Sequence, residues 1–318
     1  MCHIMKDKTR PLSFLIFLSL MLFAETKTSG TVFYNYTREL NSEGFNAFNM
    51  KRAYLTLVND VTEEVSYKVT YDMGDNGDEN AHAAFLKVAM VNWTTSVGDV
   101  SLGMQGMNMF KTMENTWGHR FISKMPMHKY GFSSSADLGI GLSQVFGAIS
   151  TSALITNGAG YKKAETDSHK KFSFHAVYGE KELKNQEGFN IGGSLSFEPY
   201  DIDEFTVKNI TVTGLFSGFS GFGFRGGLEL DSKKNSNVMN QIISLYGTYQ
   251  VVENFSLLAR LDKVDINDLV SENVTQEIIV GFRYAVGQGM TVAPTLCRRA
   301  LKTLESQNSI VVNFKFSF

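Results

Sequence analysis

Proline and cysteine are scarce in this chain of 318 residues, which has 4 Pro and 2 Cys, and its charges nearly cancel, with 30 Lys and Arg against 32 Asp and Glu. The balanced charge gives no electrostatic reason to expect a nucleic acid as partner. Cys2 lies in a segment that we expect to be removed, so Cys297 is left without a partner for a disulfide or a cysteine metal site. The 28 Gly and the 12% of aromatic residues favour many strands joined by tight turns.

Residues 1–24 have the pattern of a secretory signal peptide. A cationic stretch ends at Arg10, and an apolar run follows over residues 12–23. A transmembrane helix needs roughly 20 apolar residues, and this run is shorter; an N-terminal anchor is the alternative. We place the cleavage after Ala24, which leaves residues 25–318 as a single mature unit.

Long apolar runs are also lacking after Ala24, so the mature chain can enter a membrane only with strands. Such strands must close into a barrel, because an open sheet would leave backbone N–H and C=O groups unpaired in lipid. A strand of this kind alternates between lipid and water at every residue. The C-terminal segment does so: one face carries Ile310, Val312, Phe314, Phe316 and Phe318, and the other carries Ser309, Asn313, Lys315 and Ser317.

The same alternation recurs in about sixteen segments, which predicts an all-β fold: a transmembrane antiparallel up-and-down β-barrel. The segments lie near residues 30–39, 46–59, 63–73, 82–94, 98–108, 134–143, 146–156, 171–180, 188–198, 205–216, 221–231, 239–250, 254–263, 275–285, 289–299 and 307–318. Those near 146–156, 239–250 and 289–299 alternate poorly, and Pro294 lies in the last, so about fourteen strands are the alternative. A ring of about sixteen strands is too wide for its own side chains to fill, so we expect an aqueous lumen.

Several segments resemble the porins related to the phosphate-selective porins O and P of Gram-negative outer membranes. They cover most of the mature chain and lie at residues 48–55, 67–72, 86–91, 102–105, 114–120, 134–139, 249–262 and 289–294. Met90 stands where an aromatic residue is more typical of that family, and no phosphate-binding set can be matched residue by residue. The resemblance implies an outer-membrane barrel that conducts small solutes, and it does not carry phosphate selectivity over to this chain.

The alternation also assigns charged side chains to the lumen. The cations are Arg52, Lys68, Lys87, Arg225, Arg260, Arg283 and Lys315, and the anions are Asp72, Asp137, Glu229 and Asp262. Because rings of charged side chains set ion preference in wide pores, this basic excess predicts weak anion selectivity. The alternative is that these charges only solvate the lumen and pair with one another.

The connection 109–133 is the longest, and we expect it to fold into the lumen and narrow it. Glu114, Arg120 and Lys124 would face the constriction. The residues that would pack the loop against the wall are Met113, Trp117, Met125 and Met127. Loops of this length are usually functional or mobile, so an ordinary external loop is the alternative.

Catalytic patterns in the sequence are accidental matches. Three glycines within residues 221–226 spell a dinucleotide-binding pattern, but aromatic residues interleave them in a strand and no helix follows. His119 and His128 lack the spacing of a dedicated metal site. Ser173 and His175 both point inward, away from the lipid interface that a barrel phospholipase would use. We therefore expect no enzyme activity, no cofactor and no bound metal.

Taken together, these features predict a porin of the bacterial outer membrane for passive diffusion of small hydrophilic solutes or ions. Its expected partners are outer-membrane lipids and small hydrophilic solutes or anions, without nucleic acid. A homotrimer is expected by analogy with general porins. One alternative is a non-conducting barrel that acts as an adhesin or a structural protein, and another is a barrel hydrolase.

Overall fold

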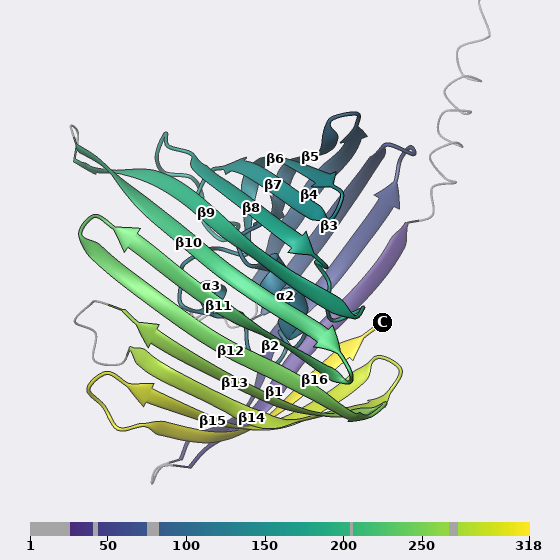
Figure 1. Ribbon diagram of the computed structural model, residues 1–318, viewed down its shortest axis with the longest axis vertical. Coiled ribbons are helices and arrows are strands. Elements are labelled where there is room, and N and C mark those ends of the chain that lie inside the picture. Colours follow the sequence, from purple (N-terminus) through teal and green to yellow (C-terminus); the bar gives the residue numbers. More distant parts are fainter. Residues whose placement is uncertain (1–25, 41–43, 75–82, 204–205, 267–272) are drawn as a thin grey trace, which may run out of the picture.

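The computed structural model describes residues 26–40, 44–74, 83–203, 206–266 and 273–318, so the expected signal peptide lies outside the described part. Within that part, sixteen strands form one closed antiparallel barrel (Figure 1). Each strand pairs with its neighbours in sequence, and the first closes on the last. The prediction of an all-β barrel with about sixteen strands is confirmed.

The strands are β1 (Lys27–Glu39), β2 (Asn46–Asp60), β3 (Val65–Gly74), β4 (Ala83–Thr95), β5 (Gly98–Gly106), β6 (Ala136–Phe146), β7 (Ile149–Thr156), β8 (Lys171–Gly179), β9 (Gly188–Asp203), β10 (Thr206–Gly221), β11 (Phe224–Asn235), β12 (Val238–Val252), β13 (Phe255–Asp265), β14 (Val274–Gly287), β15 (Met290–Leu301) and β16 (Gln307–Ser317). Two short helices, α2 (Lys111–Trp117) and α3 (Pro126–Lys129), lie between β5 and β6. No helix among the described residues is long and apolar enough to cross a membrane.

The outer face of the barrel is apolar. Along β13, Leu257 and Leu261 are exposed, whereas Leu258 and Asp262 between and beside them are buried inside. On β10, Leu215 exposes 63% of its surface. Because soluble monomers do not carry a continuous apolar band of this kind, the outer face is that of a transmembrane barrel.

The two ends of the barrel differ in the length of their connections. We call the turn end the one with the short connections, such as 96–97, 147–148, 222–223 and 288–289. The opposite end, the loop end, carries the connections 107–135 and 157–170 among others. Bacterial barrels place their short turns in the periplasm, which gives the chain its orientation.

Two connections depart from the simple alternation of short turns and long loops. Where the sequence predicts an external loop at 199–204, β9 continues to Asp203 and β10 begins at Thr206. At the turn end, the connection 180–187 between β8 and β9 is longer than the other turns. The alternation of side chains marks the buried middle of a strand better than its solvated ends, so strand ends are the part that it predicts least well.

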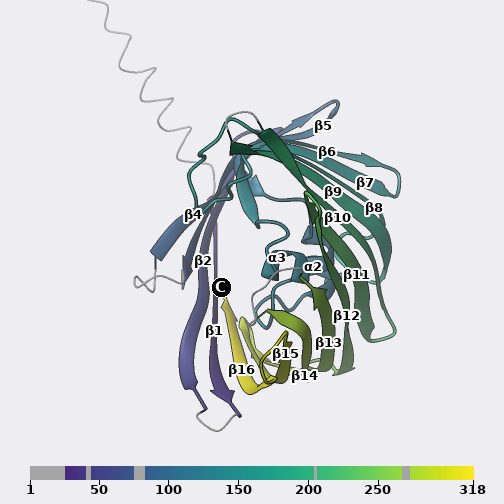
Figure 2. The same cartoon turned by 90° about the vertical axis from the view of Figure 1, so that its left-hand side faces the viewer.

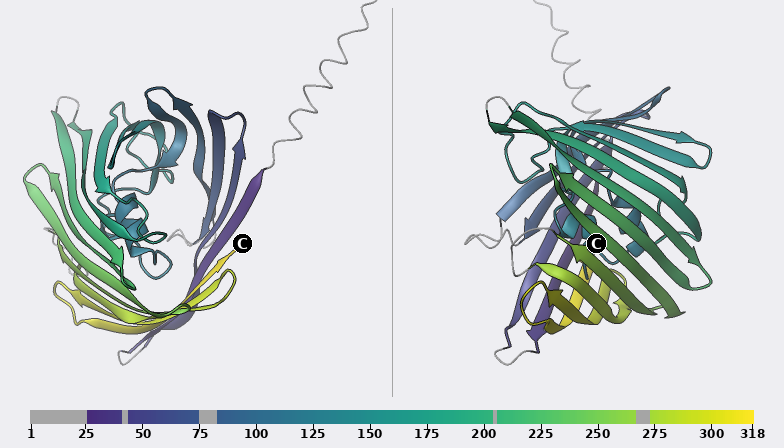
Figure 3. Two further views of the ribbon diagram at one scale, coloured as in Figure 1. Left: turned by 45° about the vertical axis from the view of Figure 1, so that its right-hand side comes forward. Right: turned by 60° about the vertical axis from the view of Figure 1, so that its left-hand side comes forward.

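The connection 107–135, which we call the inner loop, lies inside the barrel together with α2 and α3 (Figures 2 and 3). The residues predicted to pack it against the wall expose 1% of their surface or less: Met113, Trp117, Met125 and Met127. They form one cluster with inward-facing residues of strands from β8 round to β15 and β1, namely Val177, Val212, Phe216, Ile242, Tyr246, Leu258, Ile279, Ala293, Cys297 and Phe33. The prediction that this loop folds into the lumen is confirmed, and it covers only one side of it.

The inner loop explains why some strands alternate poorly in sequence. In β12, the inward residues Ile242 and Tyr246 are apolar, yet they are buried at 1% and 3% exposure because the inner loop covers them. A strand whose inward face packs on protein rather than on water has no need of polar residues there. All three poorly alternating segments are full members of the barrel, so the alternative of about fourteen strands is wrong.

Candidate channel and constriction

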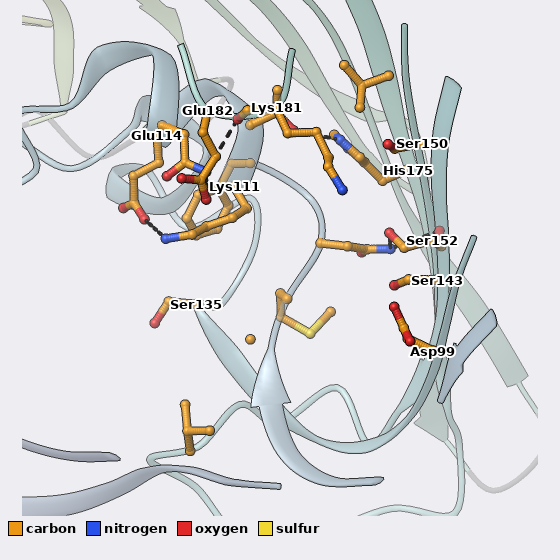
Figure 4. Close-up of a pocket in the computed structure, with 18 of the residues that line it drawn as sticks. Asp99, Lys111, Glu114, Ser135, Ser143, Ser150, Ser152, His175, Lys181 and Glu182 are labelled. Carbon is orange, nitrogen blue, oxygen red and sulfur yellow. Dashed lines mark hydrogen bonds and ion pairs between the residues drawn. The ribbon is translucent and has the colours of Figure 1, made fainter. Parts of the chain in front are cut away.

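A cavity of about 820 Å³ lies between the inner loop and the wall formed by β2 to β8, which we call the open wall (Figure 4). On the open wall, Ser143 and Ser152 line the cavity, and Asp99 lies near its turn end. On the opposite side stand Lys111 and Glu114 of α2. Hydroxyl and charged groups therefore face the same space from both sides.

Toward the loop end, the cations of the open wall gather around Asp72 of β3, which is fully buried. Its carboxylate accepts from Arg52 Nη1 at 3.5 Å and from Lys87 Nζ at 3.4 Å. The Tyr161 hydroxyl, from the connection 157–170, donates to the same carboxylate at 2.8 Å. Two cations and an external loop thus share one carboxylate, and the predicted inward direction of Arg52, Lys87 and Asp72 is correct.

A tyrosine bridges the open wall and the inner loop. The Tyr54 hydroxyl of β2 lies 3.2 Å from Lys87 Nζ and 3.5 Å from Arg120 Nη2. Arg120 also forms an ion pair with Glu114, and Lys111 donates to that carboxylate at 3.2 Å. The passage is narrowed where these side chains meet, so Tyr54, Lys87 and Arg120 form the candidate constriction.

The electrostatics of the inner loop keep most of its charges fixed. Burial opposes ionisation of Glu114, but Arg120 and Lys111 lower its pKa to about 2. Burial likewise disfavours the charged form of Arg120, yet Glu114 raises the pKa of that guanidinium above its usual value. Burial, and then the nearby Arg52 and Arg120, lower the pKa of Lys124 to about 8. The loop therefore carries an ion pair that stays charged at neutral pH and a lysine whose pKa is lowered to about 8.

Three residues predicted to line the pore do not do so. Glu229, Arg260 and Asp262 face inward, as the alternation predicts, but they expose at most 2% of their surface because the inner loop covers them. Arg260 donates to the Asp262 carboxylate through Nε at 2.8 Å and Nη2 at 2.7 Å. Its Nη1 donates to the backbone carbonyl of Lys124 at 2.8 Å, and its guanidinium lies 5.6 Å from the Trp117 ring centroid. The Arg260–Asp262 pair fastens the inner loop instead of facing the solute.

The other predicted residues lie in two separate places. Lys68 lines the 820 Å³ cavity with the constriction residues. Arg225, Arg283 and Lys315 line a second cavity of about 550 Å³ at the turn end, beneath His119 of the inner loop. Ten of the twelve predicted positions are thus divided among the 820 Å³ cavity, a buried group and a second cavity. Arg52 and Lys124 line neither cavity, and Arg52 instead pairs with the buried Asp72.

Some residues of the site cannot be found from the alternation. Lys51 precedes the inward Arg52, so a regular strand would turn it toward lipid. A register shift between β1 and β2 at this point lets Lys51 face inward as well, where its Nζ donates to the Ile122 carbonyl at 3.2 Å. Tyr161 lies in a connection, for which alternation makes no prediction. Asp137 points inward but binds the backbone N–H of Gly158 at 2.6 Å, so it holds the connection 157–170 in place.

His175 and His128 hold the inner loop in place. His175 contacts Thr112 of α2 at 2.9 Å and Ser194 of β9 at 3.0 Å through its two ring nitrogens, so it docks the helix. The His128 ring stacks on Phe110, with 5.2 Å between centroids. Within the described ranges, no group of three or more His, Cys, Asp or Glu is placed to hold a metal ion.

These features define a class of protein: a transmembrane barrel of sixteen strands over its described residues, with a loop folded into its lumen. Solved structures of this class superpose on the chain along nearly its whole length. OmpF of Salmonella typhi, in complex with daunomycin, has a TM-score of 0.69 at 10% identity, covering 93% of this chain and 98% of that chain. The anion-selective porin from Comamonas acidovorans has a TM-score of 0.67 at 11% identity, covering 93% and 100%.

A third similar structure is OmpT, an outer-membrane protein of Vibrio cholerae, in its trimer form, with a TM-score of 0.65 at 8% identity over 93% of this chain and 99% of that chain. No protein-family model and no curated protein matches the sequence. At identities this low, the structural similarity establishes the fold alone, which is that of bacterial outer-membrane porins. The apolar outer face of the barrel fits a location in the outer membrane.

Proposed function

We propose that the chain forms a water-filled channel in the bacterial outer membrane for passive diffusion of small hydrophilic solutes, with a weak preference for anions. The observation that carries the proposal is the one-sided packing of the inner loop. The loop buries its apolar residues against strands from β8 round to β15 and β1, and it leaves a cavity with hydroxyl and charged groups along the open wall. A loop that only plugged the barrel would need no such charged face.

The expected anion preference follows from the charges that line the cavity. The cations are Lys68, Lys87, Lys111, Arg120 and Lys181, and the carboxylates are Asp99, Glu114 and Glu182. A basic excess in a narrow, partly desolvated passage attracts anions and repels cations. The anion-selective porin with a similar fold is consistent with this proposal. The motif resemblance to porins O and P supports a channel for small solutes, and it carries no phosphate selectivity over to this chain.

The proposed channel has no catalytic role, and its partners are lipids around the outer face and solutes in transit. A homotrimer is proposed because OmpT, of similar fold, occurs in a trimer form. Cross-linking of the chain in outer-membrane vesicles would test this assembly, and a monomer alone would contradict it.

One observation favours the alternative of a non-conducting adhesin or structural barrel. The inner loop narrows the lumen from one side. The connection 157–170, which the Tyr161–Asp72 hydrogen bond holds to the open wall, narrows it from the other side. Conductance of the refolded protein in a planar bilayer separates the two functions. Stepwise ion currents are the expected result, and a stably inserted barrel without current would favour the adhesin.

A further inference from the structure

The second cavity has a charge pattern that the channel does not explain. Its inward cations come from strands at the turn end of the barrel: Arg225 from β11, Arg283 from β14 and Lys315 from β16. The strands between them contribute hydroxyl groups that line the same space: Thr248, Ser256 and Thr291. Hydroxyl donors between guanidinium and ammonium groups are the surroundings that bound oxyanions have in proteins.

No carboxylate of the described residues forms an ion pair with these cations. In the described ranges, the ion pairs of the barrel involve other residues, and none includes Arg225, Arg283 or Lys315. The carboxylates that line the cavity, Glu187 and Glu253, belong to the turns at its rim. The interior of the cavity is therefore positively charged and open to a ligand from the turn end.

The inner loop holds one of the cations in a fixed place. Arg225 Nη2 donates to the Trp117 carbonyl at 3.3 Å and to His119 Nε2 at 3.3 Å. The Thr248 hydroxyl lies 3.0 Å from His119 Nε2. Gly118 makes this approach possible, because a Cβ at that position would lie 2.8 Å from the Arg225 guanidinium. The buried Nε of Arg225 has no hydrogen-bond partner among the described residues. The guanidinium is thus positioned but not saturated.

The three cations all act electrostatically on the His119 imidazole. Burial is the first cause that lowers its pKa well below the usual value, and the charges of Arg225, Arg283 and Lys315 add to it. The imidazole is therefore neutral at physiological pH, and it accepts the hydrogen bond from Arg225. A negative ligand placed among the cations would relieve the repulsion that they exert on one another.

We propose that this cavity, the turn-end site, binds a small oxyanion that carries two or more negative charges. Three cations without counter-charge favour a polyvalent ligand over a chloride ion, because each cation adds to the attraction. The volume of about 550 Å³ is more than an isolated oxyanion group fills, so the ligand has several charged groups or an organic body. The site depends on the fold alone and not on ion conduction through the proposed channel.

Inorganic pyrophosphate is a suitable probe, and Trp117 is a suitable reporter. The Trp117 ring lies 5.0 Å from the His119 ring, and Trp93 is the other of the 2 Trp in the chain. A W93F background, refolded in detergent micelles, leaves Trp117 as the source of fluorescence. Titration with pyrophosphate at constant ionic strength, with chloride as the monovalent control, gives the dissociation constant, and isothermal calorimetry gives it independently.

The test compares R283Q, K315Q and the double substitution with the W93F background. Each lost charge-assisted contact should weaken pyrophosphate binding about tenfold or more. Lys208→Gln, an exposed cation on β10, is the matched control and should bind as the background does. Circular dichroism verifies the refolded barrel, and the single variants serve if the double variant does not refold. Equal affinity in the background and the variants, or no binding in the background, would overturn the proposal. Because no current is measured, either outcome is independent of whether the barrel conducts.

Discussion

The Arg260–Asp262 clamp predicts how firmly the inner loop is held in the lumen. Replacing Arg260 with Met removes the bidentate contact to Asp262 and the hydrogen bond to the Lys124 carbonyl. The Asp262 carboxylate then keeps only Ser244, at 2.6 Å, as a side-chain partner among the described residues. We expect the loop to become unstable inside the barrel.

The magnitude follows from the burial of the pair, since both side chains are inaccessible to solvent. Removing one partner of a buried ion pair typically costs about 3–5 kcal/mol, because the other charge is left uncompensated. The inner loop covers Asp262 only while the loop is in its native position. Release of the loop would expose the Asp262 carboxylate to water and so avoid that cost. The outer face of β13 is apolar and faces lipid, so the barrel itself should remain closed.

Limited trypsin digestion of the refolded protein in micelles measures loop release, because Lys124 and Lys129 lie within the loop. R260M should be cleaved there much faster than the parent protein, and its single-channel current should be larger or noisier. The double substitution R260M/D262L should be cleaved more slowly than R260M, because an apolar pair leaves no buried charge. Arg298→Met, an exposed arginine on β15, is the control. If R260M resists trypsin as well as the parent does and conducts alike, the clamp does not hold the loop.

Three further predictions concern the channel. Deleting residues 113–129 should raise single-channel conductance, and unchanged conductance would show that the loop does not narrow the passage. Because the pKa of Lys124 is lowered to about 8, its charge is present below that pH and lost above it, so anion preference should fall as pH rises through about 8. The same pH profile of anion preference in Lys124→Met would contradict this prediction. Asp72→Asn removes the carboxylate that Arg52 and Lys87 share, so reversal potentials should shift toward anions, and a shift toward cations would be the opposite of the expected result.

The barrel could be predicted from the sequence because lipid and water impose a two-residue period on every strand. The C-terminal strand shows this most plainly, since Phe314 and Phe316 stack with Tyr34 on the outer face while Asn313 is buried inside. The same rule fails where protein replaces water in the lumen. The inward Ile242 and Tyr246 of β12 look irregular until the inner loop is placed over them.

The channel and its constriction were harder to predict, because the alternation shows which way a side chain points and not which groups surround it. Arg260 and Arg225 both point inward, but one lies under the inner loop and the other faces a cavity. The alternation does not place Lys51 inside the barrel, because a bulge at this residue turns its side chain to the other face of the strand. The position of the inner loop decides the cases of Arg260 and Arg225, and its contacts are formed between residues far apart in sequence.

We propose that the open wall and the inner loop enclose a conducting, mildly basic passage. Planar-bilayer recording of the refolded, unmodified chain under a salt gradient tests it most directly. We predict discrete current steps and a reversal potential of the sign that anion preference gives. A barrel that inserts without current, or that carries current with clear cation preference, would contradict this claim.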